Sequence, residues 1–150
     1  MKRFKTESIS RYINYLYRQG VSFLGNEYKD YNIGAGQYQF LLYLYMKDGI
    51  TQDELTHKIG VDKAATTRAI TKLEENGYVK RVHDEKDKRK HHIFLTEYSK
   101  KNKEEIINVS KKWENGLVEE LTKEEIEQFY YLLRKITKNE LKDDFNEETI

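Results

Sequence analysis

The fold is decided by residues 51–96, which read TQDELTHKIGVDKAATTRAITKLEENGYVKRVHDEKDKRKHHIFLT. Thr51 followed by Glu54 is a capping box, in which the threonine hydroxyl accepts from an early helical N–H and the glutamate accepts from the cap residue's own N–H. We therefore expect a short helix to begin at this point. A tight glycine-containing turn follows it, and Asp62 can cap a second helix over residues 63–76.

The second helix has two chemically different faces. Its inner face is apolar or small, at Thr66, Ala69, Ile70 and Leu73. Its outer face is basic and rich in hydroxyl groups, at Lys63, Thr67, Arg68, Thr71 and Lys72. Two helices joined by such a turn, the second of them cationic, are typical of a helix-turn-helix. The second helix fits the DNA major groove, where Arg and Lys donate to guanine and Thr donates or accepts.

A charged hairpin follows the second helix. Residues 78–83 and 91–95 favour two short strands, joined by a tip that contains seven charged side chains in succession. The hairpin extends the pattern to a winged helix-turn-helix. Arg89 near the tip is placed to reach a minor groove, and Asp87 can orient its guanidinium through a carboxylate fork. We expect the wing to meet DNA through Lys86, Lys88, Arg89 and Lys90, with Asp87 as the orienting group.

The flanking sequence predicts helices on both sides of the winged segment. Apolar side chains at helical spacing indicate a long helix over residues 8–28 and a nearly all-apolar one over 37–46. Thr96 caps a helix expected to continue to Leu121, and a second capping box at Thr122 opens a last helix expected to carry Leu141. The predicted fold is mainly α with a small β-hairpin wing.

We divide the chain accordingly into three regions. Residues 1–34 form the N-terminal helix of a dimerisation region, 35–98 the winged helix-turn-helix, and 99–150 the C-terminal dimerisation helices. The apolar faces of the terminal helices exceed what a small winged core can cover, which predicts a homodimer. A two-fold protein can present two recognition helices to a palindromic site in double-stranded DNA.

Composition excludes several classes of site and protein. The chain has 150 residues, weighs 18.0 kDa and contains no cysteine, which excludes disulfides, thiolate metal sites and cysteine chemistry. The longest apolar run covers residues 40–46, whereas a bilayer span needs about twenty residues. No charged-then-apolar leader opens the sequence, so we expect a cytoplasmic protein without a membrane partner.

Charge is distributed unevenly behind a formal net charge of +1. Residues 1–60 carry a net charge of +2, residues 61–103 carry +5 and residues 104–150 carry −6. The basic middle segment favours an anionic partner for that segment alone. The alternative explanation of this charge distribution is a solvated surface with uneven salt bridges, and charge alone does not decide between the two.

Four short stretches in order also carry a resemblance to a known family. They are Val61-Asp62-Lys63, then residues 73–79 (LEENGYV), then Asp87-Lys88-Arg89, and finally Leu95-Thr96. Together they resemble the signature of the MarR (multiple antibiotic resistance regulator) family, and the resemblance covers nearly the whole chain. It implies a dimeric DNA-binding regulator, usually a repressor, whose N- and C-terminal helices interlock. It also implies release from DNA on binding of a small aromatic or phenolic ligand, an oxidant or a metal.

The residues restrict the choice of effector. Family members that sense oxidants generally use cysteine, which is absent here. His91 and His92 should face opposite sides of a strand, although His83 could meet one of them across the hairpin. We expect no metal and no cofactor, and keep a metal-responsive regulator as the alternative. Eight of the twelve tyrosines lie in the first 45 residues, which favours an aromatic-lined pocket; its candidate residues are Tyr12, Arg18, Tyr38 and Tyr43. The alternative for each tyrosine is helix packing with its hydroxyl at the surface.

The sequence supports two other functional classes, an enzyme and an adaptor, less well than a DNA-binding regulator. The sequence contains no phosphate loop, GxSxG elbow, HExxH pair or dinucleotide fingerprint, so we do not expect an enzyme. An adaptor that uses the winged fold for protein or RNA contact is the remaining alternative. RNA readers usually expose stacking aromatics on a sheet, whereas here the basic groups lie on a helix and a wing, which favours duplex DNA.

Overall fold

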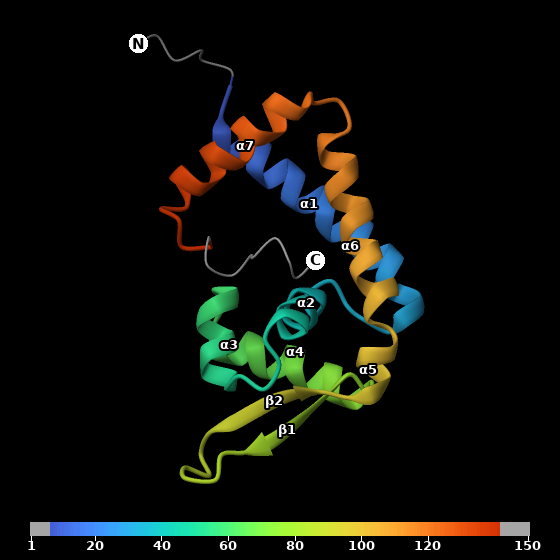
Figure 1. Ribbon diagram of the computed structural model, residues 1–150, viewed down its shortest axis with the longest axis vertical. Helices are drawn as coiled ribbons and strands as arrows, with labels where there is room; N and C mark the ends of the chain where they lie inside the picture. The colour runs from blue at the N-terminus through green and yellow to red at the C-terminus, as the bar shows by residue number, and fades with distance from the viewer. Residues whose placement is uncertain (1–6, 142–150) are drawn as a thin grey trace. The chain divides into compact units, whose positions relative to one another are not determined.

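The computed structural model describes residues 7–141 (Figure 1). The chain divides into two compact units, 1–109 and 110–150, and each is described on its own. Over residues 7–141, no helix combines the length and the apolar character that crossing a membrane requires.

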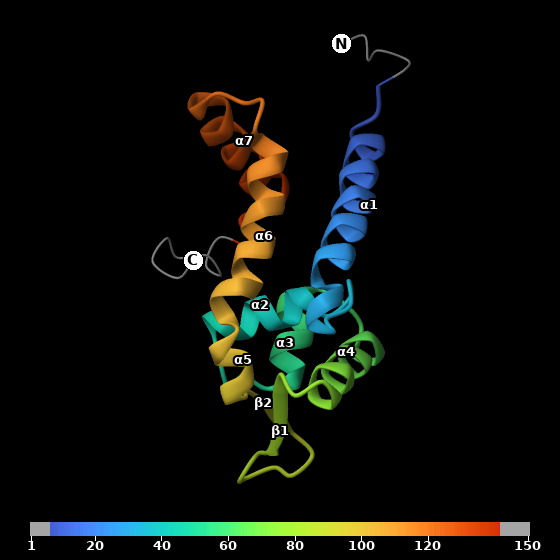
Figure 2. The ribbon, with the colours of Figure 1, turned by 90° about the vertical axis from the view of Figure 1, so that its right-hand side faces the viewer.

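The first unit contains most of the helices and the only hairpin of the described residues. Its elements are α1 (Ile9–Glu27), the short 3-10 helix η1 (Tyr28–Tyr31), α2 (Tyr38–Met46), α3 (Gln52–Ile59), α4 (Lys63–Glu75), β1 (Val79–His83), β2 (His91–Leu95), α5 (Glu97–Lys101) and the start of α6 (Lys103–Val118). The strands pair antiparallel, with Val79 opposite Leu95 and His83 opposite His91. Figure 2 shows the hairpin projecting from this unit beside α4. The predicted fold, mainly α with a hairpin wing, is confirmed.

Local capping signals place the helices of the wing region as predicted. The hydroxyl of Thr51 accepts from the N–H of Glu54 at 3.1 Å, and the Glu54 carboxylate accepts from the N–H of Thr51 at 3.0 Å. Asp62 caps α4 by accepting from the N–H of Ala65 at 2.7 Å. These bonds satisfy helix-end donors that have no partner within the helix, so they fix where α3 and α4 begin.

Tyrosine hydroxyls tie the core of the first unit together. Tyr28 is fully buried and donates to the carbonyl of Ile106 at 2.8 Å. Tyr45 donates to the carbonyl of Ser99 at 2.7 Å. Each buried hydroxyl thus has its hydrogen bond, while its ring packs with the apolar core. The largest fully buried aliphatic side chains are Ile33, Leu41, Leu44, Leu55, Ile70, Leu73, Ile93 and Ile106.

Two predicted helix boundaries are wrong. The helix expected to run without a break after Thr96 is interrupted at Asn102, whose side-chain amide donates to the carbonyl of Tyr98 at 2.8 Å. Such a local bond gives the backbone an alternative to the helical pattern. The last helix, expected to carry Leu141, ends at Ile136, because Lys138 and Asn139 adopt left-handed backbone conformations with φ of 54° and 59°.

The second unit contains the rest of α6 and helix α7 (Lys123–Ile136). The predicted capping box at its start is present, with the Thr122 hydroxyl accepting from the N–H of Glu125 at 3.2 Å and the Glu125 carboxylate from the N–H of Thr122 at 2.8 Å. None of the residues of α7 is buried in the single chain. Large apolar side chains are exposed along it, at Phe129, Tyr130, Tyr131, Leu132, Leu133 and Ile136.

Candidate nucleic-acid interface

Helix α4 presents the two faces that the sequence predicts. The inner residues Thr66, Ala69, Ile70 and Leu73 are buried, and the hydroxyl of Thr56 on α3 donates to that of Thr66 at 2.9 Å. On the outer face Lys63, Thr67, Arg68 and Lys72 are exposed and Thr71 is half-buried. Within residues 7–141, Arg68 forms no hydrogen bond or ion pair, which leaves its five N–H donors for a ligand.

The other outer-face side chains already have partners within the chain. The Thr67 hydroxyl donates to the carbonyl of Lys63 at 2.9 Å, and the Thr71 hydroxyl accepts from Arg81 at 2.9 Å. Lys63 lies 3.4 Å from Asp53, and Lys72 donates to Glu75 at 2.8 Å. Both ion pairs are exposed, so DNA phosphates can replace the carboxylates at little cost.

Arg81 on β1 connects the elements of the candidate interface, and the sequence did not predict this. Its side chain is only 19% exposed, and its guanidinium donates to both α3 and α4. The acceptors are Gln52 Oε1 at 3.2 Å, Glu74 Oε1 at 3.0 Å, the Thr67 carbonyl at 3.2 Å and Thr71 Oγ1 at 2.9 Å. Arg81 therefore fixes α4 to both the wing and α3. The alternation of strand residues could have indicated that Arg81 points inward, because it lies two residues after the buried Val79 and shares the same face of β1.

At the wing tip, Asp87 holds Arg89 through the predicted carboxylate fork. Arg89 donates from Nε to Asp87 Oδ1 at 3.0 Å and from NH2 to Oδ2 at 3.1 Å. The backbone N–H of Arg89 also donates to Oδ1, at 3.1 Å. These bonds lower the pKa of Asp87, and the Arg89 side chain stays 90% exposed. Lys86, Lys88 and Lys90 are exposed around it.

The three hairpin histidines separate as strand geometry requires. His83 and His91 face each other across the ladder, with ring centroids 4.5 Å apart. His92 lies between Gly49 and Asp84, with Nδ1 2.9 Å from the carbonyl oxygen of Gly49 and Nε2 2.7 Å from Asp84 Oδ2. The His92–Asp84 pair was not foreseen. Over the described part of the chain, no three His, Asp or Glu side chains converge as a metal site would require.

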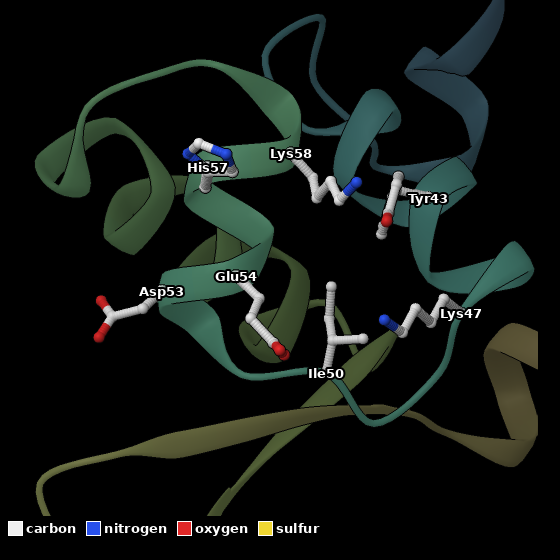
Figure 3. Close-up of a pocket in the computed structure, with 7 residues that line it drawn as sticks. All are labelled: Tyr43, Lys47, Ile50, Asp53, Glu54, His57 and Lys58. Carbon is white, nitrogen blue, oxygen red and sulfur yellow. The ribbon is translucent and has the colours of Figure 1, made fainter. Parts of the chain in front are cut away.

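One candidate effector residue, Tyr43, lines a pocket of about 340 Å³ between α2 and α3 (Figure 3). Its other lining residues are Lys47, Ile50, Asp53, Glu54, His57 and Lys58. Figure 3 shows Lys58 pointing toward Tyr43, while Asp53 points away from the other lining side chains. The pocket therefore combines an aromatic ring and two ammonium groups, which are donors for an organic anion, with the carboxylates of Asp53 and Glu54.

The other three candidate effector residues lie elsewhere in the first unit. Tyr12 lines a separate pocket at the start of α1, Arg18 is exposed on the same helix, and Tyr38 stacks on the buried Tyr28 with ring centroids 5.5 Å apart. The four residues do not line one pocket, and their role in effector binding stays a prediction.

Known proteins share the arrangement of α3, α4 and the hairpin. The sequence model of the MarR family matches residues 33–91. The uncharacterized HTH-type transcriptional regulator YybA of Bacillus subtilis (strain 168) is 33% identical over 131 residues, which cover 87% of each chain. A MarR transcriptional regulator from Methanosarcina mazei Go1 is 38% identical and superposes with a TM-score of 0.84, covering 89% of this chain and 96% of that one. The chain belongs to the MarR family.

A MarR-family regulator from Listeria monocytogenes, crystallised with a 26-mer DNA, has the same fold. It is 26% identical to this chain with a TM-score of 0.82, over 93% of each chain. The relatives of this MarR-family chain are transcriptional regulators. The elements that such proteins share here are the winged helix-turn-helix and its flanking helices, so the chain is a helix-turn-helix transcriptional regulator.

Proposed function

We propose that this chain is a cytoplasmic, homodimeric repressor that binds a palindromic operator and leaves it when a small aromatic or phenolic effector binds. One observation carries the proposal: two guanidinium groups, Arg68 on α4 and Arg89 on the wing, are exposed on elements that Arg81 joins into one body. One group suits the major groove and the other the minor groove of the same duplex.

Helix α4 supplies the base-reading part of the proposed interface. Arg68 has no competing partner within residues 7–141, so binding guanine O6 and N7 costs it no internal hydrogen bond. Lys63 and Lys72 flank it on the same face and attract phosphates. The threonine hydroxyls at 67 and 71 contact DNA in addition to the internal bonds they make, since each oxygen has further hydrogen-bonding capacity.

The wing supplies a preorganised cation. The fork from Asp87 restricts the Arg89 side chain before DNA arrives, so less conformational entropy is lost on binding. A guanidinium held in this way suits the negative potential of a narrow minor groove. Lys86, Lys88 and Lys90 contribute charge without sequence preference.

Exposed apolar side chains support the homodimer. On α1, Ile9 is 72% exposed and Tyr17 70%, and on α7 Ile136 is 67% exposed. Monomeric soluble proteins rarely leave contiguous apolar faces of this kind in water. A second copy would cover them, and two-fold symmetry would place two α4 helices on half-sites about 34 Å apart.

The pocket at Tyr43 supports the effector. A phenolic or aromatic carboxylate could stack on the tyrosine ring and pair with Lys47 or Lys58. Because α3 forms one wall and also packs against α4, an occupant that favours one position of α3 would shift the population of DNA-binding dimers.

A binding experiment separates this proposal from its alternatives. Fluorescence anisotropy should show tight, salt-sensitive binding to a duplex from the region upstream of the gene, and much weaker binding to a scrambled duplex or to RNA of the same sequence. Equal affinity for RNA, or no affinity for any duplex, would contradict it. Release of the duplex by zinc but by no aromatic acid or phenol would favour a metal-responsive regulator instead.

A further inference from the structure

The base of the wing is joined to the α2–α3 loop through one imidazole. His92 on β2 places Nδ1 2.9 Å from the carbonyl oxygen of Gly49 and Nε2 2.7 Å from the Asp84 carboxylate. Both partners are acceptors, so both ring nitrogens must donate for both bonds to form. Only the doubly protonated, cationic imidazole can do so. The geometry therefore selects the charged form of His92.

The same contacts continue to the wing tip. Asp84 Oδ1 accepts from the backbone N–H groups of Lys86 and Asp87, each at 2.9 Å, and Asp87 in turn holds Arg89. A continuous chain of hydrogen bonds thus links Gly49 to the guanidinium proposed to enter the minor groove. Loss of one bond at His92 leaves the turn attached to the body of the unit by fewer contacts.

The Gly49 end of this chain is firmly placed. Gly49 adopts a left-handed conformation with φ of 77°, and a Cβ there would lie 2.8 Å from the ring of Phe94. Its N–H donates to the carbonyl of Ile93 at 2.9 Å, beside His92. The Gly49 carbonyl, which accepts from His92, is therefore held in place by the backbone hydrogen bond of Gly49 and by a backbone conformation that only glycine fits here.

The charges around His92 also favour the cation. Asp84 faces it from the hairpin turn and Glu54 from α3, and Lys47 at the end of α2 acts on Glu54. The hydrogen bond to Asp84 and the one to the Gly49 carbonyl raise the pKa of His92 above its ordinary value. The bond from His92, together with those from the backbone N–H groups of Asp87 and Lys86, lowers the pKa of Asp84 to about 2. Asp84 thus stays ionised at every pH at which His92 titrates.

We propose that His92 is a positioning residue for the wing: its cationic form holds the turn that carries Arg89, and loss of its proton as pH rises frees the wing and weakens DNA binding. This inference rests on the proposed function. The folded-state pKa of His92 lies above the unfolded value. Both hydrogen bonds of His92 are therefore formed below about pH 6.5, and one of them is lost as pH rises through the raised pKa.

The test measures duplex affinity from pH 6 to pH 9 at constant ionic strength, for the full-length protein and three variants. His92→Gln keeps an amide donor but cannot titrate, and His91→Gln is the matched control on the neighbouring strand position. Asp84→Asn can donate from its amide to a neutral imidazole while its oxygen still accepts from the turn. His91→Gln shows how much the pH dependence changes when a hairpin histidine other than His92 is lost.

The wild type should lose roughly three- to tenfold more affinity across this range than His92→Gln does. His91→Gln should lose nearly as much affinity as the wild type, and Asp84→Asn as little as His92→Gln. Identical pH profiles for the wild type and His92→Gln would overturn the inference.

A second measurement is independent of DNA. The NMR titration of the His92 ring should give a raised pKa in the wild type, and a value close to that of an exposed histidine in Asp84→Asn. An unraised pKa in the wild type would overturn the proposal that cationic His92 holds the wing, even if DNA binding is strong. If the wild type binds no duplex at any pH, the proposed function fails, and the role of His92 in DNA binding fails with it, whatever the titration shows.

Discussion

The carboxylate of Glu74 on α4 accepts from both the guanidinium and the backbone N–H of Arg81 on β1, at 3.0 Å each. Arg81 reaches from there to Gln52 on α3 and to Thr71 on α4. One side chain therefore sets the position of the recognition helix relative to the wing. Because both elements are proposed to contact one duplex, this bond network determines the spacing of Arg68 and Arg89.

Replacing Arg81 should reduce stability substantially. Arg81→Ala removes hydrogen bonds to four acceptors around a mostly buried group, so we expect a loss of about 1–3 kcal/mol in the free energy of unfolding. Chemical denaturation measures this loss. The exposed neighbour Lys80 gives the control, because Lys80→Ala should change stability by no more than about 0.5 kcal/mol. Equal effects of the two substitutions would show that the network carries no stability.

Arg68 and Lys88 should differ in what they do for DNA binding. Arg68→Ala should cost about 1–3 kcal/mol on the cognate duplex and relax its base preference. Lys88→Ala should weaken cognate and random duplexes alike and reduce the salt slope by about 1. Competition binding over a series of salt concentrations measures both. Parallel losses on cognate and random DNA for both variants would argue against base reading by α4.

Asp87 offers a test in which simple charge counting predicts the opposite sign. Asp87→Asn removes a negative charge next to DNA, yet it should weaken binding roughly three- to tenfold because the fork that orders Arg89 is lost. In an Arg89→Ala background the same change should have little effect, since the two residues act as a pair. Tighter binding by Asp87→Asn would show that orientation of Arg89 is unimportant.

Asp84 should make stability depend on acidity. Its folded-state pKa of about 2 lies below the unfolded value, so its contribution is present above about pH 4 and is lost as pH falls through about 2. Thermal unfolding of Asp84→Asn should therefore lose less of its Tm between pH 4 and pH 2 than the wild type. Glu85→Gln, at the exposed neighbouring position, should follow the wild type. Identical acid sensitivity of all three proteins would contradict the pairing with His92.

The exposed face of α1 should decide the oligomeric state. Ile13 is 56% exposed, and Ile13→Glu would place a charge in the proposed dimer interface. Sedimentation should show a dimer for the wild type and a shift toward monomer for this variant. Ser22→Glu, on the opposite face of the same helix, should leave the dimer intact. A monomeric wild type at micromolar concentration would remove the basis for a palindromic operator.

Local signals explain why the starts of α3, α4 and α7 and the arrangement of the wing tip were predictable. The capping boxes at Thr51 and Thr122, the cap at Asp62 and the two-faced pattern of residues 63–75 each depend on neighbours within four positions. The fork between Asp87 and Arg89 is equally local. Such features follow from chain geometry before any tertiary contact forms.

Features that depend on tertiary register were missed. The acceptors of Arg81 lie on two helices, α3 and α4, that are distant from it in the sequence, and His92 meets Gly49 only after the hairpin has docked on the α2–α3 loop. Tyrosine spacing in the first 45 residues shows which helix face is aromatic but not which neighbour each ring meets, so Tyr38 stacks on Tyr28 while Tyr43 lines a pocket. The break at Asn102 depends on a side-chain bond that competes with a continuing helix.

The central claim is that α4 and the wing engage one duplex at the same time. Footprinting on the upstream duplex tests it directly, with dimethyl sulfate reporting guanine N7 in the major groove and hydroxyl radicals reporting the minor groove. The account predicts protection of both grooves by the wild type, loss of the major-groove signal in Arg68→Ala and loss of the minor-groove signal in Arg89→Ala. Protection of a single groove by the wild type, or both signals intact in both variants, would contradict it.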